Sequence, residues 1–494
     1  MLDKESAARW RITNSANDYR QLAKLSDVQY VKSCCIFCGL VMLHISIPSS
    51  RQATDSSGKA YTIFEIYINN AYHCSSRYSQ LLRLHEIIKK ILLKDVPNFP
   101  PKYINAIAGD RLLNERREAL QEYLRTVFSI KDVIRNIRVQ QFFLDAQRES
   151  ASLAARQLSN EVPVYLLDGS KYIIQCCPGD STNVVLERLA VIVGLPPIEL
   201  TRYFGLFIVT KSEVFPYKII RWLENFECPL LSLFYVAKLG IKAKIILRKK
   251  YFDSSIESSL IKKEQALRIL YSQAVFDVKI FLSRQGCLTI ASRKCRWQLI
   301  DEKYFPSLMK NTDAVNSPDE YLRCCQEQPW YGFVFFEQCL CSYPKMNTVA
   351  HVAVGNRRLL ILHEVSQGEI KEITFRVTRI RSWRLSIMSI HGSQDLSFEY
   401  LFSNNHLEWI TLRSSQSVLI SCCLQSMIEE IVNSQADAIA ASASSKKTMP
   451  MQSGAILNES SLESLLNSSL KPKRSLHDTF EIGLVSMNSS EAHD

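Results

Sequence analysis

A strand-like stretch of this sequence passes directly into a helix-like one at Arg77 and Tyr78. Residues 61–69 alternate between the two faces of a strand, Asn69-Asn70 is typical of a hairpin turn, and a second strand runs on to Arg77. From Tyr78 onward, apolar residues and one histidine recur at helical spacing: Leu81, Leu84, His85, Ile88, Ile91 and Leu92. A fold that satisfies both periods holds Arg77 and Tyr78 at the junction of a strand and a helix.

Two further basic residues stand in separate segments behind this junction. Lys102 follows the element Pro97-Asn-Phe-Pro100, whose prolines stiffen an extended loop. Arg116 lies in another helix, one turn before Leu120. A guanidinium fork suits bidentate recognition of phosphate, and the face of a tyrosine can pack against a sugar-like ring. The segments therefore predict a basic pocket with one aromatic wall, although each charge taken singly is also typical of a solvated surface.

The order of these motifs resembles the PX domain, a phosphoinositide-binding module. The motifs are Arg-Tyr-Ser before a helix, then Pro-x-x-Pro-x-Lys, then Arg-x-x-x-Leu-x-x-Tyr. The resemblance implies that Arg77 holds the 3-phosphate and that Tyr78 packs under the inositol ring. It also implies that Lys102 contacts the 1-phosphate and that Arg116 bonds the ring hydroxyls. Many relatives carry another basic residue two positions before the motif arginine, where this chain has Ser75.

Net charge and hydrophobicity indicate the class of partner. The 494 residues are 47% hydrophobic, which is enough for several cores, and the usual domain size predicts roughly three or four domains. The net charge of +11 favours a polyanion, either nucleic acid or an anionic membrane. No motif of a nucleic-acid-binding fold is present, so the membrane is the better candidate. The longest apolar run, Cys34–Ile47, is shorter than the roughly 20 residues of a membrane-spanning helix.

The cysteines and the missing catalytic motifs argue against metal or enzyme chemistry. The 15 cysteines include adjacent pairs, which indicate a reducing cytosol rather than a disulfide framework. Cys35-x-x-Cys38 and Cys339-x-Cys341 lack a second half at zinc-finger spacing. Phosphate-binding glycine loops, metalloprotease helices and nucleophile elbows are missing as well. We therefore expect no catalytic residue, no metal, no cofactor and no enzymatic activity.

Changes in hydrophobic pattern divide the chain into an α+β multidomain protein. The chain is expected to begin with a poorly ordered extension (1–42), followed by the PX-like domain (43–150). The next lobe has a hairpin, a helix and strands in ubiquitin-like order (161–248), and a mainly helical lobe follows it (249–335). The last lobe has seven strands closed by a helix, as in PTB or pleckstrin-homology-like sandwiches (336–436), and a disordered tail ends the chain (437–494).

Ubiquitin-like, helical and PTB-like lobes in this order form a FERM module. With the PX-like domain in front, the chain resembles the sorting nexins that join a PX domain to a FERM-like module, of the sorting nexin 17 and sorting nexin 31 type. The resemblance covers roughly residues 43–436, and its markers include Tyr203-Phe-Gly-Leu-Phe, Phe398-Glu-Tyr-Leu and Cys423-Leu-Gln-Ser-Met427. It implies a PX domain, three FERM lobes (F1, F2 and F3) and a flexible C-terminal tail.

The resemblance also implies a peptide groove in the PTB-like lobe. Its edge strand would contain Trp383, and its closing helix would offer Ile428 with Leu424 and Val432 nearby. Receptor tails with Asn-Pro-x-Tyr-type motifs would bind by strand addition, in which backbone hydrogen bonds give affinity and side-chain pockets give selectivity. From the residues alone, Trp383 is also compatible with a core position and Ile428 with the buried face of its helix.

These features predict an endosomal cargo adaptor that detects a lipid and a receptor together. The PX pocket would hold this cytoplasmic, peripheral protein on early endosomes through phosphatidylinositol 3-phosphate, while the FERM-like module captures the receptor tail and promotes recycling to the plasma membrane. The resemblance adds a retriever-type recycling complex as partner of the tail, which Phe480-Glu481 match loosely. A FERM-type membrane–cytoskeleton linker or signalling scaffold is the alternative, against which the PX pocket argues.

Overall fold

The computed structural model of the chain separates into two compact units, Met1–Glu430 and Ile431–Asp494. None of the helices in the described residues combines the length and the apolar character that crossing a membrane requires. The ten cysteines in this described part are all free thiols. The described residues are 8–12, 43–55, 57–58, 60–94, 96–102, 110–212, 217–283, 318–328, 331–366, 369–387, 394–403 and 406–445.

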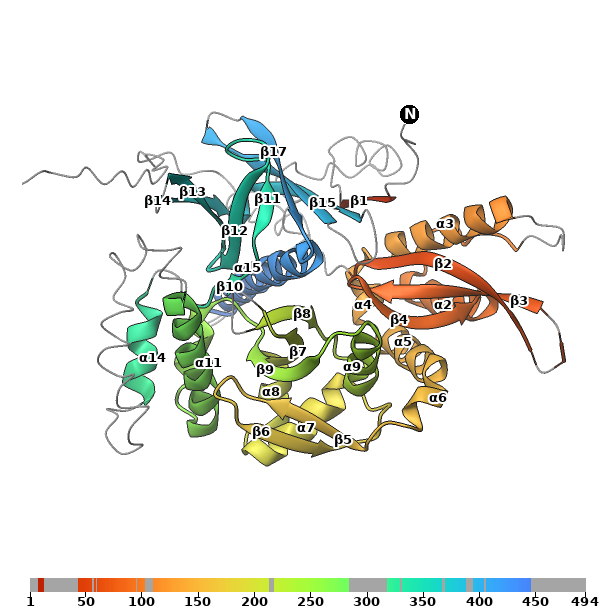
Figure 1. Cartoon of the computed structure of the whole chain (residues 1–494), viewed down its shortest axis with the longest axis horizontal. Coiled ribbons are helices and arrows are strands. Elements are labelled where there is room, and N and C mark those ends of the chain that lie inside the picture. The colour runs from red at the N-terminus through yellow and green to blue at the C-terminus, as the bar shows by residue number, and fades with distance from the viewer. Residues whose placement is uncertain are drawn as a thin grey trace, which may run out of the picture. The chain divides into compact units, whose positions relative to one another are not determined.

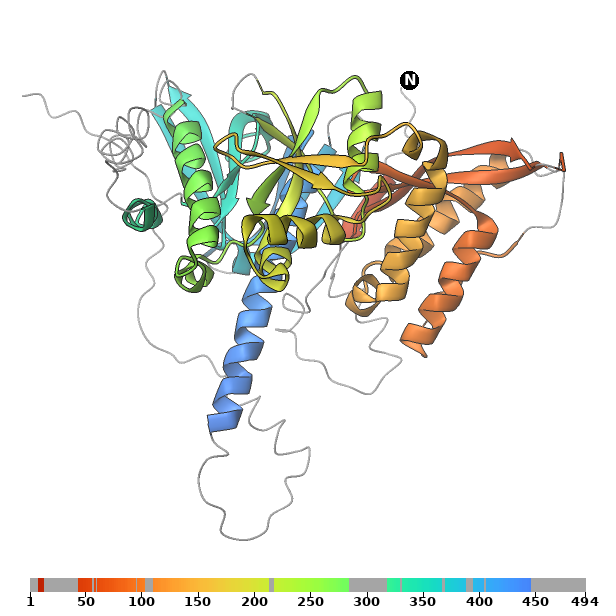
Figure 2. The same ribbon diagram turned by 90° about the horizontal axis from the view of Figure 1, so that it is seen from below.

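The PX-like domain is a three-stranded antiparallel sheet with helices on one face (Figures 1 and 2). Asn69 and Asn70 have φ values of 49° and 62° and form the tight turn of the central hairpin, as predicted. The last strand continues without a loop into the first helix, which confirms the junction at Arg77 and Tyr78. The elements are β2 (Ile45–Thr54), β3 (Ala60–Ile68), β4 (Ala71–Arg77), α2 (Tyr78–Leu92), α3 (Asp110–Val127), α4 (Lys131–Arg135), α5 (Ile137–Ser150) and α6 (Ser152–Ala155).

The ubiquitin-like lobe is a five-stranded mixed sheet in the order β6-β5-β9-β7-β8. Ser181 caps its main helix by accepting from the N–H of Val184, and Gly194 ends the helix at φ 78°. The predicted hairpin, helix and strands are present, but β8 and α9 were not expected because short apolar runs carry no clear period. The elements are β5 (Glu161–Tyr165), β6 (Lys171–Gln175), α7 (Thr182–Val193), α8 (Pro197–Tyr203), β7 (Phe204–Thr210), β8 (Lys218–Trp222), α9 (Pro229–Lys238) and β9 (Ala243–Lys249).

The helical lobe shares its core with the ubiquitin-like lobe. Tyr271 and Tyr321 meet edge to face at 5.2 Å between centroids, and one continuous apolar cluster joins them to β7 and β9. Residues 284–317 of the predicted helical lobe lie outside the described residues. The described elements are the short turns η2 (Ser254–Ile256) and α10 (Glu257–Leu260) and the helices α11 (Glu264–Ser283) and α14 (Pro318–Gln326).

The PTB-like lobe is built on a sheet in the order β15-β16-β17-β11-β12-β13-β14, with β10 paired to β12. It has eight strands of its own rather than the predicted seven, because the first part of the lobe forms two short strands, β10 and β11, in place of one. The closing helix continues to Ser445, beyond the expected boundary at residue 436. The elements are β10 (Val334–Phe335), β11 (Cys339–Cys341), β12 (Thr348–Gly355), β13 (Arg358–Ser366), β14 (Glu369–Arg376), η3 (Val377–Arg379), β15 (Ile380–Ile387), β16 (Gln394–Leu401), β17 (Leu407–Ser414) and α15 (Ser417–Ser445).

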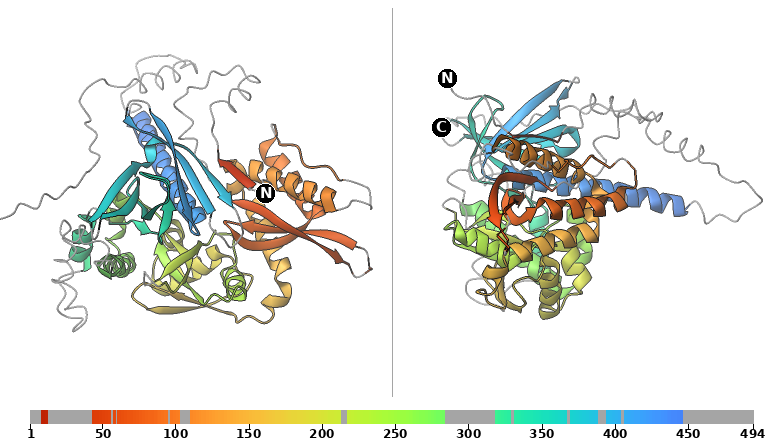
Figure 3. Two further views of the ribbon diagram at one scale, coloured as in Figure 1. Left: turned by 45° about the horizontal axis from the view of Figure 1, so that its top comes forward. Right: turned by 90° about the vertical axis from the view of Figure 1, so that its right-hand side faces the viewer.

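A further strand from the N-terminal region joins this sheet. Strand β1 (Ala8–Ile12) pairs antiparallel with β15, from Ala8 opposite Ile387 to Ile12 opposite Trp383. The sequence predicts a poorly ordered extension over residues 1–42, but Ala8–Ile12 find backbone partners on the open edge of β15. The other residues of that range up to Met42 lie outside the described part of the chain. Figure 3 shows β1 beside β15 in its left-hand view.

A buried polar joint connects the PX-like domain to the ubiquitin-like lobe. His73 on β4 has no exposed surface, and its Nε2–H donates to the backbone oxygen of Phe143 at 3.0 Å. Burial, together with the nearby Arg221, lowers the pKa of His73 to about 3, so the ring is neutral. Across the domain boundary, Nδ1 of His73 lies 3.5 Å from Oε1 of Glu227, which is also fully buried and pairs with Arg221. These contacts fix the orientation of one domain against the next without requiring a charged histidine.

Candidate functional site

Arg77 stands at the end of β4 with its side chain exposed. Its backbone N–H donates to Oε1 of Gln80 at 2.7 Å, which ties the strand end to the first turn of α2. The guanidinium carbon lies 3.4 Å from the centroid of the Tyr61 ring on β3. Stacking on one face sets the plane of the guanidinium and directs its N–H groups outward along its edges. Tyr61 is therefore a platform that orients the guanidinium of Arg77.

Tyr78 joins the other segments of the predicted pocket. Its hydroxyl donates to the backbone oxygen of Pro100 at 2.7 Å, and its ring lies 5.4 Å from that of Phe99. On the α3 side, the guanidinium carbon of Arg116 is 5.7 Å from the Tyr78 centroid. Burial raises the pKa of Tyr78, and the positive charge of Arg116 opposes that rise. Three segments that are separate in the sequence thus meet at one ring.

The two adjacent arginines of α3 have different surroundings. Arg116 faces Tyr78, whereas Arg117 donates from Nη1 to the backbone oxygen of Ile47 at 2.7 Å and so holds α3 to β2. Lys102 is exposed, two residues after the carbonyl that anchors Tyr78. Residues 103–109, which follow Lys102, lie outside the described residues.

Tyr61 was missed by sequence reasoning, although the register of the hairpin contains the signal for it. Ile63 is the residue opposite Arg77, so Tyr61 is the diagonal neighbour on the same face of the sheet. A long side chain reaches such a neighbour. Gln80 was also missed, since its role depends on the cap geometry and not on a motif.

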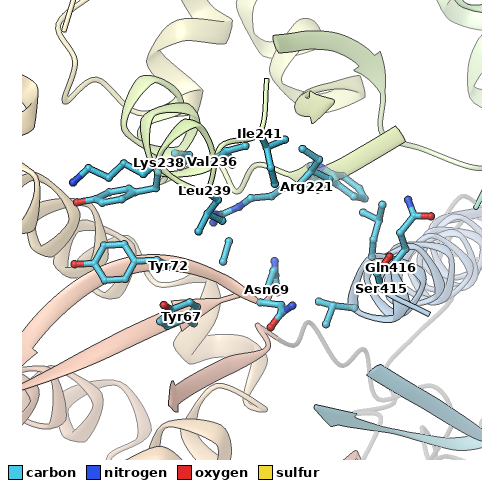
Figure 4. Close-up of a pocket in the computed structure, with 18 of the residues that line it drawn as sticks. Tyr67, Asn69, Tyr72, Arg221, Val236, Lys238, Leu239, Ile241, Ser415 and Gln416 are labelled. Carbon is cyan, nitrogen blue, oxygen red and sulfur yellow. The ribbon is translucent and has the colours of Figure 1, made fainter. Parts of the chain in front are cut away.

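Ser75 lies elsewhere, in the wall of a cavity of about 660 Å³ between three lobes. Its Oγ pairs with the hydroxyl of Tyr72 at 2.8 Å. Figure 4 shows Tyr67, Asn69 and Tyr72 of the β3–β4 hairpin on one side of the cavity. The side chains labelled on the other sides are Arg221, Val236, Lys238, Leu239 and Ile241 of the ubiquitin-like lobe and Ser415 and Gln416 of the PTB-like lobe.

The cations in the wall of this cavity already have partners. Arg51 pairs with Glu65 at 3.5 Å, Arg221 pairs with Glu227, and Nζ of Lys238 lies 4.7 Å from the Phe234 centroid. Asn69 donates to Oε1 of Glu224 at 3.0 Å across the domain boundary. The contact between Asn69 and Glu224 makes the cavity part of a joint between the PX-like domain and the ubiquitin-like lobe.

Trp383 and the closing helix of the PTB-like lobe are in direct contact. The Nε1–H of Trp383 donates to Oγ of Ser421 on α15 at 3.0 Å. Leu424 and Ile428 follow Ser421 by three and seven residues, so all three share one face of the helix. Trp383 and Ile428 are each 7% exposed, whereas Leu424 has no exposed surface and lies in the core of the lobe. Val432 is half-buried on the part of α15 that belongs to the second unit.

The same serine links Trp383 to the PX-like domain. Oγ of Ser421 lies 3.1 Å from Nε2 of His44, the residue just before β2. Burial lowers the pKa of His44 to about 4, with a smaller contribution from Arg125, so the ring is neutral. Because Trp383 donates to Ser421, the serine hydroxyl is available to donate to His44 in its Nδ1–H form. The backbone N–H of His44 in turn donates to Oδ1 of Asn69 at 3.2 Å.

The edge of β15 beside Trp383 is occupied in this structure. On one side β15 pairs with β16, and on the other it pairs with β1. A strand has only two hydrogen-bonding edges, so no third segment can pair with residues 383–387 while β1 is in place. The strand that was predicted to offer a free edge, β15, therefore has residues of this same chain on both of its edges.

Known families match three parts of the chain. The PX domain matches residues 65–146, and the F1 lobe of the FERM domain of sorting nexins 17, 27 and 31 matches residues 160–252. The C-terminal FERM domain of sorting nexin 17 matches residues 332–432.

Curated relatives align over most of the chain. Sorting nexin-17 of Homo sapiens is 32% identical over 406 residues, which cover 79% of this chain and 82% of that protein. Sorting nexin-17 of Danio rerio is 31% identical over 406 residues, which cover 79% and 81%. Sorting nexin-31 of Mus musculus is 27% identical over 399 residues, which cover 78% and 86%.

Proposed function

This chain belongs to the sorting nexin 17 family, in which a PX domain precedes a FERM-like module, and from that membership we propose that it is an endosomal cargo adaptor. The fold class expected from the sequence, PX followed by FERM lobes, is confirmed by the same matches. Neither a PX nor a FERM domain is an enzyme, and the adaptor role needs only two binding surfaces, one for a phosphoinositide and one for a receptor tail.

The lipid proposed for the PX domain is phosphatidylinositol 3-phosphate on early endosomes. The observation that carries this part is the convergence of Arg77 on Tyr61 and of Arg116 on Tyr78. Arg77 binds the 3-phosphate through its oriented fork, and Tyr78 packs under the inositol ring. Lys102 contacts the 1-phosphate, and Arg116 bonds the ring hydroxyls. Charge-assisted pairs of this kind are about twice as strong as neutral hydrogen bonds.

The cargo proposed for the FERM-like module is a receptor tail with an Asn-Pro-x-Tyr-type motif. The contact between Trp383 and Ser421 supports it, because it brings the edge strand to the face of α15 that carries Ile428. A peptide that adds to β15 gains backbone hydrogen bonds along the strand, and its side chains rest against that helix. Leu424 backs this wall, and Val432 extends the same apolar row along α15 in the sequence.

Two weak contacts on one membrane give selective recruitment. Once the lipid is bound, the tail of a receptor in the same membrane meets the groove at a high effective concentration, so avidity exceeds either single affinity. The adaptor then directs captured receptors back to the plasma membrane. We assign a retriever-type recycling complex as partner of the C-terminal tail near Phe480, a segment outside the described residues.

Liposome pelleting tests this function. The full chain, and the chain from Leu43 onward, are mixed with vesicles that carry phosphatidylinositol 3-phosphate, a tethered Asn-Pro-x-Tyr peptide, both or neither. We expect weak pelleting with either ligand and strong pelleting with both. Equal pelleting on vesicles without phosphoinositide contradicts the lipid assignment, and pelleting that ignores the peptide contradicts the cargo assignment.

A further inference from the structure

We propose that residues Ala8–Ile12 are an internal competitor for the peptide edge of β15. The inference rests on the proposed function, since it concerns the edge at which the receptor peptide is expected to bind. Strand β1 pairs with residues 383–387 of β15, and these include Trp383. Because β16 holds the other edge of β15, a receptor peptide cannot pair with these residues until β1 has left. Binding of β1 and binding of cargo are mutually exclusive.

The short pairing of β1 makes it a weak occupant of the edge. The paired segment is only five residues long, from Ala8 to Ile12. An isolated pairing of a few residues is marginally stable in water. It therefore closes the edge without locking it, which is what a displaceable competitor requires.

The last residue of β1 and the first residues of the PX domain lie near each other. Ile12, the last residue of β1, is the register partner of Trp383. The described chain resumes at Leu43, and the next residue, His44, reaches Trp383 through the shared hydroxyl of Ser421. The described residues Ile12 and His44 therefore both lie near Trp383. Closing a loop whose ends meet costs only a term that grows slowly with its length, so the tether favours pairing of β1.

The expected effect on cargo binding follows from the tether. A tethered segment acts at an effective concentration on the order of 1 mM, so a strand that binds in trans with a Kd of about 100 µM weakens peptide binding about 10-fold. Removing β1 should therefore tighten the binding of an Asn-Pro-x-Tyr peptide by about that factor. Lipid binding through Arg77 should not change, because the PX pocket is separate from this edge.

Calorimetry with an Asn-Pro-x-Tyr peptide tests the competition on four forms of the protein. These are the full chain, the chain from Leu43 onward, the full chain with Ala8–Ile12 replaced by a Gly-Ser sequence, and the full chain with the same replacement at Arg20–Lys24. The chain from Leu43 onward and the chain with Ala8–Ile12 replaced should bind the peptide about 10-fold more tightly than the full chain. The chain with Arg20–Lys24 replaced should bind like the full chain, because it keeps β1 and changes a stretch of equal length.

A peptide of residues 5–15 provides the complementary test in trans. It should compete with the Asn-Pro-x-Tyr peptide for the chain from Leu43 onward, and a Trp10→Pro version should not, because proline cannot donate to a strand ladder. If all four forms bind cargo equally and residues 5–15 do not compete, the inference is overturned while the proposed function stands. If the chain from Leu43 onward binds no Asn-Pro-x-Tyr peptide at all, the cargo function fails and the inference fails with it.

Discussion

Among single residues, the PX domain separates basic side chains that we propose bind lipid from a basic side chain that holds the fold. Arg77 is exposed and stacked on Tyr61, and Arg116 is directed to Tyr78. Arg117, one residue further on, donates a hydrogen bond to the backbone of β2. The adjacent residues Arg116 and Arg117 are therefore expected to have opposite effects when substituted, one on lipid binding and the other on stability.

Arg77→Ala should abolish recruitment to vesicles that contain phosphatidylinositol 3-phosphate while the protein stays folded. Loss of a charge-assisted bidentate pair costs about 1.5–3 kcal/mol, or roughly 10- to 100-fold in affinity. The matched control is Arg83→Ala, which removes the same charge from an exposed position of α2. Pelleting by a folded Arg77→Ala protein at the level of the parent would rule out the PX assignment of this pocket.

Tyr61→Leu should weaken the same binding by a smaller amount. The substitution keeps an apolar residue on β3 but removes the aromatic face under Arg77, a contact worth about 0.5–1 kcal/mol at an exposed site, or roughly 2- to 5-fold. In the Arg77→Ala background the same change should have little further effect, since its only route is through that guanidinium. Additive losses in the double variant would mean that Tyr61 does not act as a platform.

Arg116→Ala and Arg117→Ala form a matched pair. Arg116→Ala should reduce lipid binding with little change in the midpoint of thermal unfolding. Arg117→Ala should lower that midpoint, because a hydrogen bond from a charged group that is mostly buried contributes about 1.5–3 kcal/mol, and the folded fraction should still bind lipid. Scanning calorimetry measures the unfolding midpoint of both proteins, and vesicle pelleting measures their lipid binding. If Arg116→Ala lowered the midpoint and Arg117→Ala reduced lipid binding, the roles assigned to the two arginines would be wrong.

At the scale of elements, β15 and α15 act together. Helix α15 closes the PTB-like lobe with a buried face, and Ser421 on that face receives the indole of Trp383 from the strand. In the groove that we propose, the strand contributes a backbone edge and the helix contributes an apolar wall. Neither element would be a peptide site alone, because strand addition needs both the hydrogen-bonding edge and pockets for side chains.

Ile428→Asp should eliminate binding of Asn-Pro-x-Tyr peptides to the chain from Leu43 onward, because an unpaired carboxylate in an apolar contact is costly. Trp383→Ala should reduce binding less, since the backbone of β15 still pairs. Leu407→Asp, at an exposed position of β17, introduces the same charge elsewhere in the lobe and serves as control. Calorimetry on proteins with matched unfolding midpoints gives the order of effects, and parent-like binding by both variants would place the groove elsewhere.

At the scale of the whole molecule, neutral histidines lie at the joints between lobes within residues 1–430. His73 lies between the PX domain and the F1 lobe, and His44 lies between the PX domain and the F3 lobe. Burial is the largest cause that lowers the pKa of each, to about 3 for His73 and to about 4 for His44. Their folded pKa values lie below the unfolded value of about 6.5, so the unfolded chain binds protons first.

Stability should therefore fall as the pH drops from 7 to 5. Above pH 6.5 both states are neutral at these sites and the full stability is present, whereas at pH 5 each histidine costs about 2 kcal/mol. His73→Gln and His44→Gln should each reduce the shift of the unfolding midpoint between pH 7 and pH 5. His406→Gln, at an exposed position, should leave the shift unchanged. An equal shift in all four proteins would mean that these histidines do not control acid stability.

The features that could be predicted are those that depend on neighbours along the chain. The switch from period 2 to period 3.6 located Arg77 and Tyr78 at a strand–helix junction, and the Asn69-Asn70 pair set the hairpin turn. The order of motifs gave the family, which the comparisons confirm. These features are local because backbone propensities and side-chain periods act over a few residues.

The features that could not be predicted depend on contacts between residues that are far apart in the chain. A helical period puts Leu424 and Ile428 on one face, but packing against the sheet leaves one of them 0% and the other 7% exposed. A run of two arginines does not say which one meets Tyr78 and which one meets β2. The pairing of Ala8–Ile12 with β15 has no local signal, because any short alternating segment fits an open strand edge and the choice is made by which edge is left open nearby.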